Sequence, residues 1–386
     1  MPRYVDIGVV HIQRYLSRTP TLRGRRGASA ALAEVTAEAE SWLHGRGKVN
    51  PQAGKVDGVL SLVVDLPETE EALVSEVLEH LRAELPGAEF QVTSGDGEDY
   101  LRAYLDELRP MVDRGDARVD LPAGAEYPLA ALCEICRVDP AITHVDLGAD
   151  DGKRAACADC DMRHEPKTRK KGRTTEKDLI DATGSGKAPE KFDDLAALAG
   201  ADAKEHLATI HADGNGIGQF FATLAGSGGG VDRASVVKQL TASTFEALSA
   251  ATCAVRRSGD AALCVVPHLL GGDDVLVSLP ADRAWQFTVA FVEDFGQRMA
   301  RLVRSLNVPG LTPPTMSAGV VFGRRNFPFA LGVEQAERLL HRAKSRGAGR
   351  AAWIGFADMV SEGTGSVGDP VSLAALRRLG DELGSL

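Results

Sequence analysis

The pattern of apolar and polar positions over residues 1–115 predicts strands that alternate with helices. Short apolar runs at Tyr4–Val10, Gly58–Val64 and Ala88–Thr93 are typical of strands. Apolar residues at helical spacing predict three helices, which are Ala28–Leu43, Thr69–Leu85 and Glu98–Val112. Strands with helices returning between them indicate an α+β fold of the ferredoxin-like kind.

The same kind of pattern restarts at His206. Strands are predicted at His206–Ala212, Ala262–His268, Val275–Leu279, Thr315–Phe322 and Ala351–Gly355. Helices are predicted at Ile217–Leu224, Asp232–Ala251, Asp282–Leu306 and Val333–Ser345. The order β-α-β-β-α-β-α-β places an antiparallel hairpin inside a second ferredoxin-like core. We therefore expect two ferredoxin-like domains, 1–120 and 206–357, separated by a four-cysteine module at 121–175 and a linker at 176–205, and followed by a tail at 358–386.

Composition and charge narrow the function classes. The net charge of −10 argues against a protein that coats nucleic acid through a broadly basic surface. No apolar run approaches the length of a membrane-spanning helix, and the N-terminus lacks the pattern of a secretory signal, so a cytoplasmic protein without membrane contact is expected. Two basic clusters stand out and are expected to be solvated, flexible segments. They comprise Arg14, Arg18, Arg23, Arg25 and Arg26, and then Lys167, Arg169, Lys170, Lys171 and Arg173.

The stretch HLLGGDDVLVSLP, His268–Pro280, combines a hairpin signal with two carboxylates. Gly271 and Gly272 suit the positive φ values of a tight turn. Taken alone, Asp273 and Asp274 are ordinary turn residues. A third carboxylate changes this interpretation, because Asp213 ends the strand that a ferredoxin-like core places beside the hairpin.

Converging carboxylates at Asp213, Asp273 and Asp274 would repel one another unless cations neutralise them. Mg²⁺, or Mn²⁺ in its place, suits a site with few carboxylates and substrate phosphate oxygens. Two such ions can activate a hydroxyl group and stabilise a departing pyrophosphate. Glycines at 214, 216 and 218 would let a triphosphate approach the start of the next helix, and Lys344 could reach the same phosphates.

The cysteines form two CxxC pairs, Cys133-Glu-Ile-Cys136 and Cys157-Ala-Asp-Cys160. This spacing supplies four thiolates for a tetrahedral Zn²⁺ in a region without a hydrophobic core of its own. A closed site of four cysteines is structural and not catalytic. The alternative is a set of four unmetallated thiols.

In order along the chain, these motifs resemble the palm-domain cyclase/polymerase of the large subunit of type III CRISPR complexes. Asp213-Gly-Asn215 follows a strand, Gly271-Gly272-Asp273-Asp274 forms a hairpin tip, Ser317-Ala318-Gly319 lies in a strand, and Ala343-Lys344 ends a helix. The opening VDIGVVHIQRYLSRTPTLRGRRGASA is similar to the start of that family's first palm-like domain, and the double CxxC lies between the two halves. The resemblance covers residues 3–357.

The resemblance implies an activity and a set of site residues. ATP or another NTP would be joined into a cyclic oligoadenylate or a cyclic dinucleotide, an alarm signal in antiphage defence, and pyrophosphate would be released. The catalytic and metal-binding residues would be Asp213, Asp273 and Asp274. The nucleotide-binding residues would be Gly214, Asn215, Gly216, Gly271, Gly272, Ser317 and Lys344.

Two departures from the family pattern shape the expectation about partners. The chain contains no His-Asp dipeptide, so the single-strand DNA cleavage of the family's HD nuclease domain is not expected. Only a short tail follows the last predicted strand, so a reduced, free-standing enzyme is at least as plausible as an RNA-guided complex. A homodimer, or a palm paired with a partner, would suit cyclisation.

Two alternatives of function stay open. A diguanylate cyclase carries a similar palm, but here Asp274-Val275 follows where that family has Glu-Phe, and the Arg257–Asp260 pair lies too far from the glycines for its inhibitory site. A catalytically silent structural subunit would instead bind RNA through the basic clusters. The clustered aspartates disfavour it, because such carboxylates are costly unless they hold cations.

Overall fold

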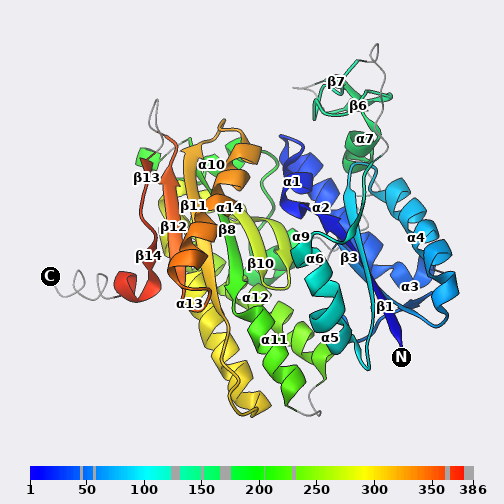
Figure 1. Ribbon diagram of the computed structural model, residues 1–386. Coiled ribbons are helices and arrows are strands. Elements are labelled where there is room, and N and C mark those ends of the chain that lie inside the picture. The colour runs from blue at the N-terminus through cyan, green and yellow to red at the C-terminus, as the bar shows by residue number, and fades with distance from the viewer. Residues whose placement is uncertain are drawn as a thin grey trace. The chain divides into compact units, whose positions relative to one another are not determined.

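The computed structural model (Figure 1) describes residues 1–43, 47–54, 58–122, 131–148, 152–165, 175–203, 205–227, 232–360 and 366–377. The chain divides into two compact units, each with its own sheet. Unit 1 comprises residues 1–174 and 232–238, and unit 2 comprises 175–231 and 239–386. The predicted α+β class is therefore confirmed.

In unit 1, a five-stranded sheet has the order β2-β3-β1-β4-β5. The central strand β1 runs antiparallel to both β3 and β4. Its side chains alternate between two apolar surfaces, so that Val5 and Ile7 are buried on one side while Tyr4 packs against Tyr100 on the other. The strands are β1 (Arg3–Val10), β2 (Lys48–Val49), β3 (Val59–Val64), β4 (Glu89–Asp96) and β5 (Arg118–Asp120). The helices are α1 (Ile12–Ser17), α2 (Leu22–Ala37), α3 (Ala39–Trp42), α4 (Glu70–Glu84), α5 (Tyr100–Ala103) and α6 (Arg109–Arg114).

Unit 1 also holds the four-cysteine module, which consists of a two-stranded ribbon and one helix. The ribbon pairs β6 (Thr143–Asp146) with β7 (Lys153–Ala156), and α7 spans Ala158–His164. Helix α7 packs directly on α2. The two helices are so close that a Cβ on Gly27 would overlap the carbonyl oxygen of Arg163. The absence of a side chain at Gly27 therefore lets the two helix backbones approach closely.

In unit 2, the main sheet has the order β13-β12-β11-β8-β10-β9, with β14 paired to β12. Its central strand β8 lies antiparallel to both β10 and β11, whereas β12 runs parallel to β11. The strands are β8 (His206–Asn215), β9 (Val266–Gly271), β10 (Asp274–Pro280), β11 (Thr315–Arg324), β12 (Trp353–Asp358), β13 (Ser366–Val367) and β14 (Val371–Ser372). The helices are α9 (Thr175–Thr183), α10 (Phe192–Ala196), α11 (Ile217–Gly226), α12 (Arg233–Val255, which belongs to unit 2 from Gln239 on), α13 (Ala281–Leu306) and α14 (Phe329–Arg346).

Helix α14 lies close against the sheet of unit 2 because two strands carry glycine where it crosses them. A Cβ on Gly319 of β11 would overlap the carbonyl oxygen of Ala336, and one on Gly355 of β12 would lie 2.5 Å from the carbonyl oxygen of Leu339. This close packing fixes the path of α14 and with it the position of Lys344 near its C-terminal end.

Several predicted elements differ from the structure in their bounds. The predicted helix Ala28–Leu43 begins earlier, at Leu22, and is divided into α2 and α3 at Glu38. Strand β8 continues through Asp213 to Asn215, because Asp213 pairs with Ser317 of β11. Strand β9 begins at Val266, later than predicted. The predicted helix Glu98–Val112 is interrupted by a π-helical segment at Tyr104–Leu108.

The first basic cluster is not the solvated segment that its composition predicts, because it lies on α1, its C-cap and α2, and two of its arginines point inward. Arg25 is buried and donates to the carbonyl oxygens of Thr19 and Pro20, and Arg18 donates to that of Gly87. The second basic cluster lies outside the described residues. In the part of the chain that the structure describes, no helix is long and apolar enough to cross a membrane.

Candidate active site

The candidate site lies where β8 meets the β9–β10 hairpin. The last pair of residues in the β8–β10 ladder is Ala212 with Val275, so Asp213 and Asp274 are the next positions along the two strands. On a pleated sheet such opposite positions share a face. The ladder thus places two of the three predicted carboxylates, Asp213 and Asp274, at neighbouring positions.

The hairpin turn is centred on Gly272 and Asp273, since Gly271 and Asp274 still pair with each other. Gly272 has a φ of +66°, a value that glycine adopts without strain. Gly271 has no positive φ, so the turn is one residue later than the sequence predicts. A Cβ on either glycine would meet no atom within 4 Å, so the surface around the hairpin tip is open.

Asp273 turns back from the hairpin tip towards Asp213. Its side chain occupies the space where a Cβ on Gly214 would be, which explains why glycine follows Asp213. Burial raises the pKa of Asp273 to about 8, and the neighbouring carboxylates of Asp213 and Asp274 add to this effect. In the absence of a cation, these carboxylates are too close to be ionised together at low cost. This is the electrostatic condition that a divalent cation would relieve, so the residues fit Mg²⁺ or Mn²⁺.

Lys344 brings a positive charge to this group. Its Nζ pairs with the carboxylate of Asp213 and donates to the carbonyl oxygen of Gly214 at 2.9 Å. Because α14 is held against the sheet at Gly319, this lysine has a defined position. The sequence predicts Lys344 as a phosphate contact, and the structure places it at the carboxylates.

The turn after β8 directs a helix start towards the same place. Gly216 has a φ of +76° and is the N-cap of α11, and its carbonyl oxygen accepts from the backbone N–H of Phe220. The first N–H groups of a helix have no partner within the helix and favour anions. Gly214 and Gly216 thus form the turn between β8 and this helix start, and their contact with a phosphate stays a prediction.

Two predicted nucleotide contacts point into the protein. Asn215 is buried, and its Nδ2 donates to Thr315 Oγ1 and Ser317 Oγ at 3.0 Å each. Ser317 is fully buried, and its Oγ also accepts from the backbone N–H of Trp353. In this conformation both residues join β8, β11 and the start of β12, and neither side chain is open to a nucleotide.

His211 was not predicted from the sequence, yet it belongs to the carboxylate group. It lies two residues before Asp213 on β8, is 3% exposed, and its Nε2 lies 2.6 Å from Asp274 Oδ1. Burial by itself would lower the pKa of His211, but Asp274 and Asp213 outweigh burial and raise it. The period of two along β8 is the signal that identifies this histidine, since alternate residues face the same side.

The four cysteines form a second cluster, in unit 1. The Sγ atoms of Cys133, Cys136, Cys157 and Cys160 all lie within 4.8 Å of one another. Hydrogen bonds with Cys157 and Cys160 lower the pKa of Cys136, whereas hydrogen bonds with Cys136 and Cys157 raise the pKa of Cys160. The opposite directions show that the neighbouring thiols hinder one another's ionisation, and a tetrahedral Zn²⁺ would stabilise all four as thiolates.

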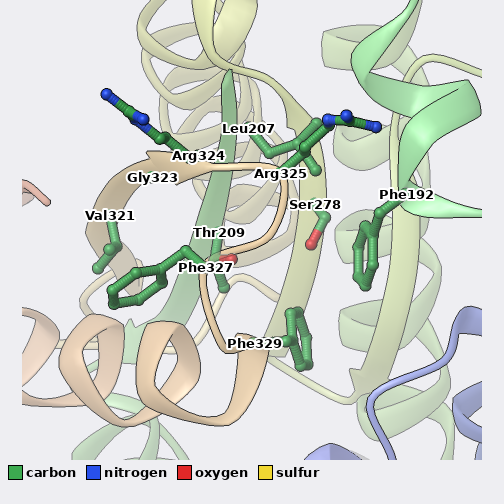
Figure 2. A pocket seen from close by; sticks show the side chains of 10 residues that line it. All are labelled: Phe192, Leu207, Thr209, Ser278, Val321, Gly323, Arg324, Arg325, Phe327 and Phe329. Carbon is green, nitrogen blue, oxygen red and sulfur yellow. The ribbon is translucent and has the colours of Figure 1, made fainter. Parts of the chain in front are cut away.

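A separate hollow lies at the other end of β8 (Figure 2). Phe192, Phe327 and Phe329 line it together with the hydroxyl groups of Thr209 and Ser278, and Arg324 and Arg325 point away from its centre. Its lining includes no carboxylate, so it is distinct from the candidate active site.

Asp260 of the Arg257–Asp260 pair, which lies too far from the glycines for an inhibitory site, has a structural role. Asp260 is buried against Arg283, whose Nη2 donates to Asp260 Oδ1 at 2.9 Å. Asp260 also accepts from the backbone N–H of Arg257 at 2.8 Å. Because both contacts are internal, the Asp260 carboxylate is not available for a ligand.

Residues 206–352 match the family described as Cas10/Cmr2, second palm domain. This range contains β8, the hairpin, Ser317 and Lys344. Unit 2 therefore contains a second palm domain of the Cas10/Cmr2 kind, and the resemblance to the large subunit of type III CRISPR complexes is confirmed.

Solved structures extend the similarity over most of the chain. A chain of the apo Csm1–Csm4 cassette matches with a TM-score of 0.56 and 13% identity, covering 92% of this chain and 53% of that chain. The cassette in complex with cA4 matches with a TM-score of 0.54 and 11% identity, covering 92% of this chain and 54% of that one. The cassette with one ATP matches with a TM-score of 0.53 and 12% identity, covering 94% and 55%. The chain thus spans about half the length of these relatives, with which it shares the fold. No curated protein matches the sequence.

Proposed function

We propose that the protein is a metal-dependent nucleotidyltransferase that makes a cyclic oligoadenylate or a cyclic dinucleotide from ATP as a signal in antiphage defence. One observation carries the proposal: Asp213 and Asp273 converge from a strand and a neighbouring hairpin, with Lys344 against them. The match of this segment to a Cas10/Cmr2 palm supports the same function.

The chemistry joins a ribose hydroxyl to an α-phosphate, so that a new P–O ester bond forms as the bond to pyrophosphate breaks. Mg²⁺ held by Asp213, Asp273 and Asp274 would supply charge stabilisation for this transfer. Lys344 would release Asp213 to the cation and turn to the phosphate groups as a point charge. Gly271 and Gly272 would let the nucleotide lie against the hairpin tip, because no side chain stands there.

Bound molecules in the related structures are consistent with this substrate. The similar Csm1–Csm4 cassettes were crystallised with ATP, pppApA, cA3 and cA4. In those structures Csm1 is paired with Csm4, and one of them is described as a subcomplex of the type III-A CRISPR-Csm interference complex. For the present chain we propose pairing of the palm, either with a second copy or with a protein partner, because cyclisation needs two nucleotides side by side.

We also propose a fold type for the two units and a ligand for the four cysteines. Both units are taken as ferredoxin-like palms, since β1 and β8 each occupy the centre of their sheet beside the third strand of a βαββαβ unit. The cysteine cluster is taken as a structural Zn²⁺ site, because its four thiols present a closed set of soft ligands.

The deciding experiment is to incubate the purified protein with each NTP in turn, with Mg²⁺ or Mn²⁺, and to resolve the products by mass spectrometry. A cyclic adenylate made by the wild type and absent from Asp273→Ala/Asp274→Ala would support the proposal. A product made from GTP alone would favour a diguanylate cyclase instead. RNA binding unaffected by Asp273→Ala, with no turnover of any NTP, would favour a catalytically silent subunit.

A further inference from the structure

His211 contacts the carboxylate group without being one of the predicted metal ligands. It lies on β8 on the same face as Asp213, opposite Leu276 of β10. From there its ring reaches diagonally to the next residue on that face of β10, which is Asp274. The imidazole of His211 therefore adds a side-chain contact between the central strand and the hairpin.

The contact between His211 and Asp274 is short and shielded. Nε2 lies 2.6 Å from Oδ1 of Asp274, and the His211 side chain is 4% exposed, whereas that of Asp274 is 25% exposed. A carboxylate offers no proton, so Nε2–H donates and Asp274 accepts. One such bond fixes the orientation of the carboxylate and leaves it further acceptor capacity for a cation.

The other ring nitrogen reinforces this assignment. Nδ1 of His211 is a buried atom with no hydrogen-bond partner among the described residues. The ring is therefore held at Nε2 alone, and its orientation depends on Asp274. The reverse also holds, because a buried ring packed into the sheet gives the carboxylate a rigid anchor.

We propose that His211 is a positioning residue that holds Asp274 in the orientation in which it binds a divalent cation. The inference rests on the proposed function for the identity of Asp274 as a ligand, but it concerns cation affinity and not the nucleotide. Outer partners that orient a ligand typically change metal affinity or activity by about 10- to 100-fold when removed.

Two amide substitutions test the role of the Nε2 position. Gln at 211 places its amide nitrogen close to where Nε2 lies and can still donate to Asp274, whereas Asn places it near Nδ1 and falls short. Binding of Mn²⁺ alone is measured by electron paramagnetic resonance of the free ion. We expect His211→Gln to bind within about threefold of the wild type and His211→Asn to bind about 10- to 100-fold more weakly.

His268 supplies a matched control for the loss of a buried histidine. It is 4% exposed, and its Nε2 lies 2.8 Å from Ser278 Oγ on the neighbouring strand, away from the carboxylates. His268→Asn should cost comparable stability and leave the Mn²⁺ affinity unchanged. A second test uses the Asp274→Asn variant. Adding His211→Asn to this variant should not weaken Mn²⁺ binding any further.

The outcomes separate this inference from the proposed function. Equal Mn²⁺ affinities for His211→Gln and His211→Asn, or a wild type that binds no Mn²⁺, would overturn the positioning role. If the Gln and Asn variants differ as expected while no NTP is turned over, the positioning role stands and the proposed function fails. Should His211→Asn not fold, the same comparison is made between His211→Gln and His211→Leu.

Discussion

At the scale of single residues, the candidate active site is assembled at a cost to stability. Asp273 lies against Asp213 with its pKa raised to about 8, so the chain retains a carboxylate where an apolar or neutral residue would be more stable. A residue that opposes folding and lies beside an open surface indicates function, because nothing in the fold requires its charge.

This cost leads to a prediction for Asp273→Asn. Without metal the variant should melt above the wild type, by roughly 2–4 °C, which corresponds to about 1 kcal/mol in a domain of this size. Added Mg²⁺ should stabilise the wild type and leave the variant unchanged, because the variant has lost a ligand. Thermal denaturation with and without Mg²⁺ measures both effects, and a metal-free variant that melts below the wild type would contradict the explanation.

Asp6 of β1 gives a pH-dependent prediction away from the candidate active site. Burial raises the pKa of Asp6. Tyr100 donates to its Oδ2 at 2.8 Å, and this hydrogen bond makes the rise in pKa smaller. Stability from a group with a raised pKa is fully present below its ordinary pKa and is lost as the pH rises through the raised value. Between pH 4 and pH 8, the free energy of unfolding of Asp6→Asn should therefore increase relative to that of the wild type. Urea denaturation across this range tests the trend, and Asp65→Asn is the exposed control.

Residue identities were predictable from the sequence only where the signal is local. Asp213 and the Gly271–Asp274 tip were found because glycines mark the turns beside them. His211 was missed because a lone histidine in an apolar strand is usually part of a core, and its partner Asp274 is distant in the sequence. The inward contacts of Asn215 and Ser317 depend on β11 and could not be predicted before the strands were paired.

At the scale of elements, the candidate active site depends on how closely α14 approaches the sheet. Apolar periodicity predicted this helix and the strands β8, β10 and β11, since each buries a continuous face. It did not predict the end of β8 or the π-helical segment in unit 1, because pairing with a distant strand and packing of neighbouring side chains decide these boundaries.

Gly319→Ala tests the approach of α14. The new methyl group would overlap the carbonyl oxygen of Ala336, so the helix must shift away from β11. We expect a loss of about 1–3 kcal/mol of stability, together with a weaker effect of Mg²⁺ because Lys344 moves with the helix. Urea denaturation and Mn²⁺ titration of the same sample measure the two consequences.

Gly296→Ala is the control for that substitution. Gly296 lies inside α13, and a Cβ there meets no atom within 4 Å. Alanine at this helix position should stabilise the protein by up to about 1 kcal/mol. If Gly319→Ala were as stable as Gly296→Ala, the close contact between α14 and β11 would not be needed for folding.

At the scale of the whole molecule, each unit has its own sheet, and the cysteine cluster belongs to unit 1. Helix α7 begins directly after Cys157, whose Sγ accepts from the backbone N–H of Cys160. On the same helix, fully buried Arg163 donates to Asp159 Oδ2 at 2.8 Å and to the carbonyl oxygen of Tyr15 at 3.0 Å. One CxxC pair of the cluster and an arginine that bonds α1 thus lie on consecutive turns of one helix.

This coupling predicts what removal of zinc does. Chelation, or Cys133→Ser/Cys136→Ser, should release the start of α7 and loosen the contact of Arg163 with α1. The unfolding transition of unit 1 should therefore fall while that of unit 2 changes little. Zinc content by mass spectrometry, calorimetry and limited proteolysis would follow the change. Cys253→Ser, at an exposed cysteine of α12, should retain full zinc content and the wild-type transitions.

The result that decides between a zinc site and four free thiols is the response of Arg163. If zinc orders α7, Arg163→Met should lower the stability of the zinc-loaded protein and have a smaller effect after chelation, since α7 has then already lost its anchor at Cys157. If the thiols never hold metal, Arg163→Met costs the same with and without chelator. Equal costs in a protein that contains no zinc would show that the buried ion pair alone attaches α7 to α1, and that the cysteines pack there as ordinary core residues.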